Sequence, residues 1–323
     1  MAKVKTFKTI FPAVSVPLND DFSINEAEFR VYLRWIKSFY GKGIEGLVCN
    51  GHTGEITGLT RAERKRVVEI CAEECGDVMT IISGVNCENT QESIEMAAEA
   101  KAAGADGILL MPPHMWLRFG MNPDAPFQYV KDVAEGADID IIIHLYPATS
   151  KAFYPVETLI KMCKEIEHVK CIKMGTRVTS IYEHDVRLLR EECPDISLIT
   201  CHDETLCVSW FPGMDGALIG FAGCVPELIC PAREVFANPD KHTLKEAQDW
   251  SDRIYHISQA IYGGGQPSGE AHARLKEALY QRGIFSSALM RKPVLPLNQE
   301  EKDWVALGLK RSQLPKVDME QYK

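Results

Sequence analysis

The sequence predicts a closed (β/α)₈ barrel followed by a C-terminal helical extension. Eight short apolar runs alternate with amphipathic segments up to about residue 240, the pattern of repeated strand–helix units. The runs are continuously apolar, as expected for strands buried on both faces of a parallel sheet. No Gly-x-Gly-x-x-Gly turn follows the first run, which disfavours an open doubly wound sheet. The predicted strands are 9–18, 43–50, 78–85, 105–113, 140–147, 169–174, 196–201 and 216–221.

Capping residues and prolines predict where helices begin and end. The signals are the capping boxes Ser23-x-x-Glu26 and Thr60-x-x-Glu63, the segment Thr90–Ala103 ending at Gly104, and Pro155 and Pro226 in first helical turns. Beyond Asp240 the strand pattern stops, and helices are predicted over 241–261, 272–282 and 300–309, with a break at Gly263–Gly265 and Pro267. We therefore predict a barrel domain over 1–238, which carries the active site, and a helical domain over 239–323.

Composition excludes several classes of protein. The 323 residues are 46% hydrophobic and 25% charged, which are ordinary globular values, and the net charge is −9. An acidic chain without a basic stripe does not suit nucleic acid or an anionic membrane, and no apolar run reaches the ~18 residues of a membrane span. Three lysines near the N-terminus precede no apolar region, so no secretory signal is expected. Eleven scattered cysteines without a Cys-x-x-Cys pair predict free thiols in a reducing cytoplasm.

In barrels of this type the active site lies at the carboxyl ends of the strands, and Lys173 is the clearest candidate there. It interrupts the apolar run VKCIKM, so its side chain should point into the barrel. Burial lowers the pKa of an amine, and a neutral amine attacks ketones to form an imine, which then acts as an electron sink. The alternative is a structural lysine paired with a carboxylate inside the barrel.

Further candidates follow the second and fifth strands. The turn Gly51–Gly54 could bind a carboxylate through its backbone N–H groups and the Thr53 hydroxyl, or could be a plain βα turn. His144 and Tyr146 lie two residues apart, hence on one strand face, where either could transfer protons. A hydrogen-bonded core histidine is the alternative for His144. The run Cys201–Glu204 fits no standard zinc spacing, so neither metal nor cofactor is expected.

Taken in order, a set of short motifs resembles the N-acetylneuraminate lyase / dihydrodipicolinate synthase family between Phe11 and Pro296. The motifs are Pro17-Leu18, Gly51-His52-Thr53-Gly54-Glu55, Leu59-Thr60-x-x-Glu63-Arg64, Ser83-Gly84-Val85, Ala103–Gly107, Pro147, Cys171-Ile172-Lys173 and Arg291-x-Pro293 with Pro296. The resemblance implies that Lys173 is a Schiff-base lysine and that residues 52–54 hold the carboxylate of a 2-keto acid. It also implies a homotetramer and no cofactor.

Several positions depart from the family pattern. His52 replaces the first hydroxyl residue of the turn, and His144 stands where the family has its catalytic tyrosine. A second family tyrosine, after strand four, corresponds to His114. Thr149 stands where the dihydrodipicolinate synthase branch has an arginine, which argues against that activity. The segment around Trp116 resembles that of the aromatic hydratase-aldolases. We expect His114 and Trp116, after the fourth strand, and Gly220, at the end of the eighth strand, to contact substrate.

These residues favour a class I lyase that joins pyruvate to an aldehyde or releases it. Lys173 would form the imine, and His144 or Tyr146 would move the proton. A keto-deoxy sugar acid dehydratase or an aromatic hydratase-aldolase could use the same imine. A metal-dependent aldolase would be sensitive to EDTA. The alternative from another class is a keto-acid sensor without activity, which the loss of both usual tyrosines would suit.

Overall fold

The structure, a computed structural model, describes residues 3–263 and 268–323 and contains the predicted barrel. Eight parallel strands form one sheet in the order β1-β8-β7-β6-β5-β4-β3-β2. The Val14 N–H donates to the Val48 carbonyl at 2.9 Å, and an Ala13–Val48 bridge joins β1 to β2 and closes the barrel. The strands are β1 (Ile10–Pro12), β2 (Gly46–Cys49), β3 (Thr80–Val85), β4 (Gly107–Leu110), β5 (Asp140–His144), β6 (Val169–Met174), β7 (Ser197–Thr200) and β8 (Gly216–Ile219).

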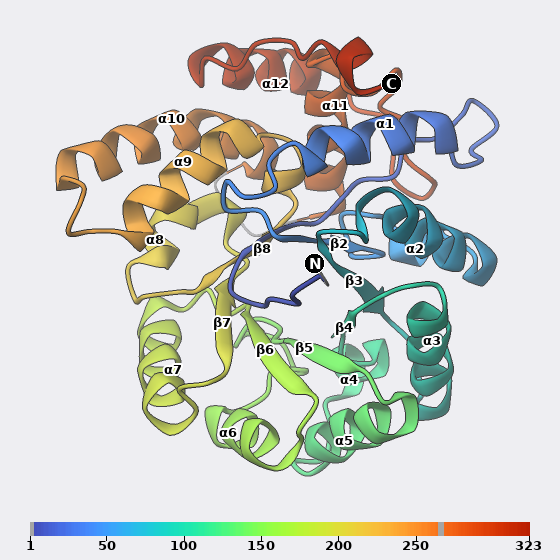
Figure 1. The fold of residues 1–323 in the computed structure, drawn as a ribbon, viewed down its shortest axis with the longest axis vertical. Helices are drawn as coiled ribbons and strands as arrows, with labels where there is room; N and C mark the ends of the chain where they lie inside the picture. The colour runs from blue at the N-terminus through green and yellow to red at the C-terminus, as the bar shows by residue number, and fades with distance from the viewer. Residues whose placement is uncertain (1–2, 264–267) are drawn as a thin grey trace.

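Helices follow the strands in turn and surround the barrel (Figure 1). They are α1 (Glu26–Lys37), α2 (Arg61–Cys75), α3 (Thr90–Ala102), α4 (His114–Phe119), α5 (Ala125–Ala137), α6 (Val156–Glu165), α7 (Thr179–Glu192), α8 (Leu206–Trp210) and α9 (Pro226–Ala237). The Thr60 capping box and the start at Pro226 are confirmed. The predicted box at Ser23 is wrong, because the Asn25 side chain accepts from Glu28 N and caps α1 instead.

The barrel interior is filled by an apolar cluster that sets which face of each strand points inward. Its members are Phe11, Ala13, Val48, Ile82, Leu109, Met111, Ile142, Cys171, Ile199 and Leu218. Side chains two residues apart share a strand face. A residue two positions after one of these cluster members, at the carboxyl end of a strand, therefore also points inward. The cluster closes the barrel below its carboxyl end, where the candidate residues lie.

Three helices follow the barrel: α10 (Leu244–Tyr262), α11 (Gly269–Gln281) and α12 (Gln299–Arg311). They lie together along one side of the barrel, shown in orange and red in Figure 1. Their buried side chains, such as Ile257 and Leu275, belong to the same continuous core as the outer layer of the barrel. Gly263, with φ of 64°, ends α10 as expected, whereas residues 264–267 of the predicted break lie outside the described residues.

No helix in the described part of the chain is long and apolar enough to cross a membrane.

Candidate active site

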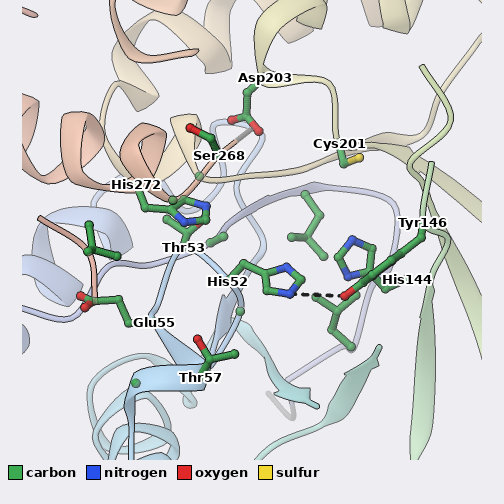
Figure 2. A pocket seen from close by; sticks show the side chains of 18 of the residues that line it. His52, Thr53, Glu55, Thr57, His144, Tyr146, Cys201, Asp203, Ser268 and His272 are labelled. Atoms are coloured by element: carbon green, nitrogen blue, oxygen red, sulfur yellow. Dashed lines mark hydrogen bonds between the residues drawn. The ribbon is translucent and has the colours of Figure 1, made fainter. Parts of the chain in front are cut away.

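A cavity of about 510 Å³ opens at the carboxyl ends of the strands, directly above the apolar interior cluster. It is lined by side chains from strands β5 and β6, from the loops that follow β2, β7 and β8, and from α11 and the segment 290–294. Figure 2 shows His52, His144 and Tyr146 gathered within it. The C-terminal helices therefore complete one wall of a cavity that the barrel begins.

Lys173 lies in this cavity on β6, in register with His144 on β5 and Ile199 on β7. Its inward orientation follows from Cys171, two residues earlier, which belongs to the interior cluster. Burial lowers the pKa of the Lys173 amine, and the nearby Arg177 cation acts in the same direction. Within the described residues, no carboxylate oxygen lies within 4.0 Å of its amine nitrogen. The alternative of a lysine locked in an ion pair therefore does not describe its surroundings.

His144 is buried beside Lys173, and its Nδ1 has no hydrogen-bond partner among the described residues. Burial lowers its pKa well below 6.5, and the positive charge of Lys173 adds to this effect. The imidazole is therefore neutral at physiological pH. A core histidine held by hydrogen bonds, the structural alternative, does not match this environment.

Tyr146 also reaches the cavity, although β5 ends at His144. Its hydroxyl is hydrogen-bonded to Nε2 of His52 at 3.4 Å, drawn as the dashed line in Figure 2. The ring centroids of Tyr146 and His144 lie 4.9 Å apart. Burial raises the pKa of Tyr146 and lowers that of His52 to about 3, so both groups are uncharged at neutral pH.

The turn after β2 places Thr53 against the loop after β8. A Cβ at Gly220 would lie 2.8 Å from the Thr53 hydroxyl oxygen, so the absence of a side chain at Gly220 gives Thr53 its room. Both residues line the cavity, whereas Gly54 does not and instead packs against the Val14 backbone.

Glu55 ties this turn to the C-terminal helices. One carboxylate oxygen pairs with Lys276 of α11, and the other accepts from the Arg291 backbone N–H at 3.0 Å. Lys276 and Glu55 are both buried, so losing either partner would leave an uncompensated charge. Glu55 also adopts a left-handed backbone conformation with φ of 57°, which the pair helps to stabilise.

Of the two residues after β4 that were predicted to contact substrate, only one lies at the cavity. His114 lines the cavity, with Nδ1 at 3.3 Å from the Glu88 carboxylate and Nε2 at 3.3 Å from the Asn86 amide. Trp116 does not line it, so its predicted substrate contact is not supported. In the short helix α4 the indole is turned into the core, where it packs against Tyr129 and Tyr154.

Three cavity residues were not predicted as site residues from the sequence. Arg177, four residues after Lys173, reaches the cavity and pairs with Glu204 at 2.5 Å. The Asp203 carboxylate accepts from Phe221 N at 2.9 Å, and burial raises its pKa to about 6. His272 projects from α11, and burial lowers its pKa to about 4.

The run Cys201–Glu204 was not expected to bind a metal ion, because its spacing fits no standard zinc site. Among the described residues, no group of three or more His, Cys, Asp or Glu side chains is arranged to hold a metal ion. Cys201 and Asp203 line the cavity, whereas Glu204 pairs with Arg177.

The model of the dihydrodipicolinate synthetase family matches residues 6–312, nearly the whole chain. The chain belongs to this family. It is accordingly an enzyme, an aldolase-type lyase of the dihydrodipicolinate synthetase family.

Individual relatives agree with this assignment. The 4-hydroxy-tetrahydrodipicolinate synthase of Bartonella bacilliformis is 26% identical over 311 residues, which cover 96% of this chain and 99% of the relative. The fold of dihydrodipicolinate synthase from Aquifex aeolicus superposes with a TM-score of 0.84 at 19% identity, over 97% of this chain and 100% of that one. YagE, a prophage protein of this family from Escherichia coli solved in complex with pyruvate, gives a TM-score of 0.85 at 19% identity and covers 96% and 100%. Because the two solved structures are only 19% identical to this chain, they support its fold and nothing further.

The buried neutral histidines predict that the folded protein loses stability in acid. The pKa is lowered to about 3 for His52 and His202, to about 4 for His272, and well below 6.5 for His144. As pH falls below the ~6.5 of an exposed histidine, the unfolded chain binds protons that the folded chain does not, so the free energy of unfolding decreases. Calorimetry should therefore show Tm falling steadily from pH 7.5 to pH 5.

The matched variant His202→Gln removes one of the four groups and should lose less Tm over the same interval. Asp185 and Asp203, whose pKa values are raised to about 6, oppose the trend because their protonation favours the folded state. The stabilisation that two aspartates contribute as the pH falls is smaller than the destabilisation that four buried histidines contribute. A Tm that stays constant or rises toward pH 5 would contradict this account of the buried imidazoles.

Proposed function

We propose that this enzyme is a class I aldolase that makes or cleaves a carbon–carbon bond to pyruvate through a Schiff base on Lys173. The observation that carries the proposal is the position of the Lys173 amine, inside the cavity, with a lowered pKa and next to His144. A neutral amine is the form that adds to a ketone, and burial increases the fraction of the Lys173 amine in that form.

In the proposed reaction the amine nitrogen of Lys173 bonds to the ketone carbon of a 2-keto acid, and water leaves to give the protonated imine. A base then removes the proton of a hydroxyl two carbons away from the imine carbon. The bond between the hydroxyl-bearing carbon and the carbon next to the imine carbon breaks, its electrons move toward the imine to give an enamine, and the hydroxyl-bearing carbon leaves as an aldehyde. The enamine carbon takes up a proton, and hydrolysis releases pyruvate and restores the amine.

The turn after β2 is the proposed site for the keto-acid carboxylate. The Thr53 hydroxyl and the backbone N–H groups of His52 and Thr53 are donors beside the cavity, and hydrogen-bond donors of this kind can bind a carboxylate. The tight packing of Thr53 on Gly220 supports this role because it restricts the hydroxyl.

His144 is the proposed proton-transfer residue, and Tyr146 is the alternative. In-register pairing puts His144 directly beside Lys173, whereas Tyr146 lies beyond the strand end and is hydrogen-bonded to His52. Two features favour His144. Its imidazole is neutral and so can accept a proton, and the Tyr146 phenol is already engaged.

A homotetramer, which the family resemblance implies, is supported by two exposed apolar patches. On α4, Met115 and Phe119 are 51% and 75% exposed, and around α8, Val208 and Phe211 are 61% and 65% exposed. Contiguous exposed apolar patches often mark surfaces that contact another protein. We propose that neighbouring subunits cover both patches.

A reducing compartment, the cytoplasm, is proposed from the cysteines. All eleven are free thiols, and ten of them are buried. A chain with this many unpaired thiols suits a compartment that keeps them reduced.

Lys173→Arg should abolish pyruvate release from 2-keto acid substrates, because a guanidinium stays protonated and cannot form the imine. The measurement is a coupled assay for pyruvate with parallel detection of an aldehyde, since cleavage releases both and dehydration gives neither. Lys170→Arg is the matched control. It lies on the same strand with its amine bound to the Glu167 carbonyl at 2.8 Å, so it should retain activity. Turnover by Lys173→Arg, or a dehydrated keto acid as the product, would refute the proposal.

His144→Ala should lower kcat/KM by about 10²–10⁴-fold, the usual contribution of a general acid–base group, and Tyr146→Phe should have a smaller effect. In the wild-type enzyme the acidic limb of the pH profile that belongs to His144 should lie well below 6.5, because burial disfavours the imidazolium. That limb should be absent from His144→Ala. If His144→Ala keeps more than about a tenth of wild-type activity, short of the acid–base range, the role passes to Tyr146.

A further inference from the structure

A second cavity, of about 610 Å³, lies at the opposite end of the barrel from Lys173. It forms where the amino ends of β1 and β8 meet helix α9 and the segment 39–43 that follows α1. The apolar interior cluster and the length of the strands separate it from the active-site cavity. Nothing in the proposed aldolase reaction uses this cavity.

Three basic side chains, Lys8, Lys42 and Arg233, line this second cavity. Arg233 donates through Nη2 to the Met214 carbonyl at 2.9 Å, and Lys42 donates to the Ser38 carbonyl at 3.0 Å. In the part of the chain that the structure describes, none of the three has a carboxylate oxygen within 4.0 Å. Three positive charges therefore meet at one cavity of a protein whose net charge is −9.

The carboxylates that line the same cavity are engaged elsewhere or exposed. Asp215 accepts from the Arg190 guanidinium at 2.7 Å and from Leu198 N at 2.9 Å.

Glu227 is paired with the guanidinium of Arg282. Glu234 is exposed and accepts from the Asn238 amide at 2.9 Å. The charge left uncompensated at the cavity is therefore positive, equivalent to about two charges after Glu234 is counted.

Arg233 is the most buried of the three basic side chains, so an anion would stabilise its charge the most. Its guanidinium is half-buried beside the Trp210 ring, 6.0 Å from the ring centroid, and burial lowers its pKa. A desolvated guanidinium with one carbonyl acceptor leaves most of its five N–H donors free, in a planar arrangement that suits two oxygens of one anion.

The rest of the lining selects against a bare ion. Phe39 and Pro231, both half-buried, give the cavity an apolar wall, and its volume falls within the range of sites for small organic ligands. A ligand that satisfies the cations and covers this wall combines a doubly charged anionic group with a compact apolar part.

We propose that this cavity is a binding site for a small organic phosphate. The phosphate oxygens lie on Arg233, Lys42 and Lys8, and the organic part packs on Phe39 and Pro231. Binding is independent of the Schiff-base chemistry, because the site shares no residue with the cavity that holds Lys173.

Isothermal titration of the full-length protein with phenyl phosphate tests this assignment, with inorganic phosphate and malonate titrated in parallel. The expected result is a dissociation constant at or below about 1 mM for phenyl phosphate and weaker binding of the other two anions. Arg233→Gln should weaken the binding of phenyl phosphate at least about tenfold, and Lys42→Gln by about threefold or more. Lys151→Gln is the matched control and should bind like wild type, because Lys151 is an exposed lysine in the loop after β5, at the opposite end of the barrel from this cavity.

Lys42 is exposed, so its variant keeps the test valid even if Arg233→Gln folds poorly. Saturating pyruvate should leave the titration unchanged. The proposal is overturned if phenyl phosphate does not bind, if pyruvate displaces it, or if both variants bind it as tightly as wild type. Malonate binding as tight as that of phenyl phosphate would overturn the phosphate assignment in favour of a dicarboxylate.

Discussion

The burial of one amine at the carboxyl end of the barrel interior is the constraint on which the site depends. The apolar cluster that ends in Cys171 and Ile199 excludes water from below, and Lys173 stands directly above it. No carboxylate approaches within 4.0 Å in the described residues, so burial is not offset by an ion pair and the pKa of the amine is lowered. A lower pKa increases the fraction of the amine that is uncharged, which is its nucleophilic form.

The same burial determines the state of the side chains around the amine. His52, His144 and His272 are all neutral at physiological pH, because burial lowers the pKa of each imidazole. Around Lys173 the cavity therefore presents neutral imidazoles, while the charged side chain of Arg177 is paired with Glu204. The buried pair Glu55–Lys276 holds the turn after β2 against α11, so the C-terminal helices help to position the site.

Much of this arrangement could be predicted from the sequence. The eight continuous apolar runs specified the strands, since only a doubly buried parallel sheet suits them, and Lys173 was conspicuous as a cation within such a run. Trp116 was misplaced, because a sequence does not show which face of a six-residue helix is buried. The predicted helix cap at Ser23 was wrong because Asn25 lies next to the first turn of α1 and caps it instead.

Arg177 and His272 were out of reach for another reason. Arg177 enters the cavity because the loop after β6 turns it back toward Glu204, and loop geometry leaves no periodic signal. His272 comes from a helix far along the chain, and its position depends on how α11 packs on the barrel. Such contacts arise from tertiary packing alone, so a single sequence does not show them.

Reductive trapping measures the central claim most directly. The wild-type enzyme is incubated with pyruvate and sodium borohydride, which reduces an imine to a stable secondary amine, and the adduct is located by intact-mass and peptide mass spectrometry. The account predicts one pyruvate-derived adduct per chain, on the peptide that contains Lys173, and none when pyruvate or borohydride is left out. An adduct on another lysine, or no adduct at saturating pyruvate, would contradict it.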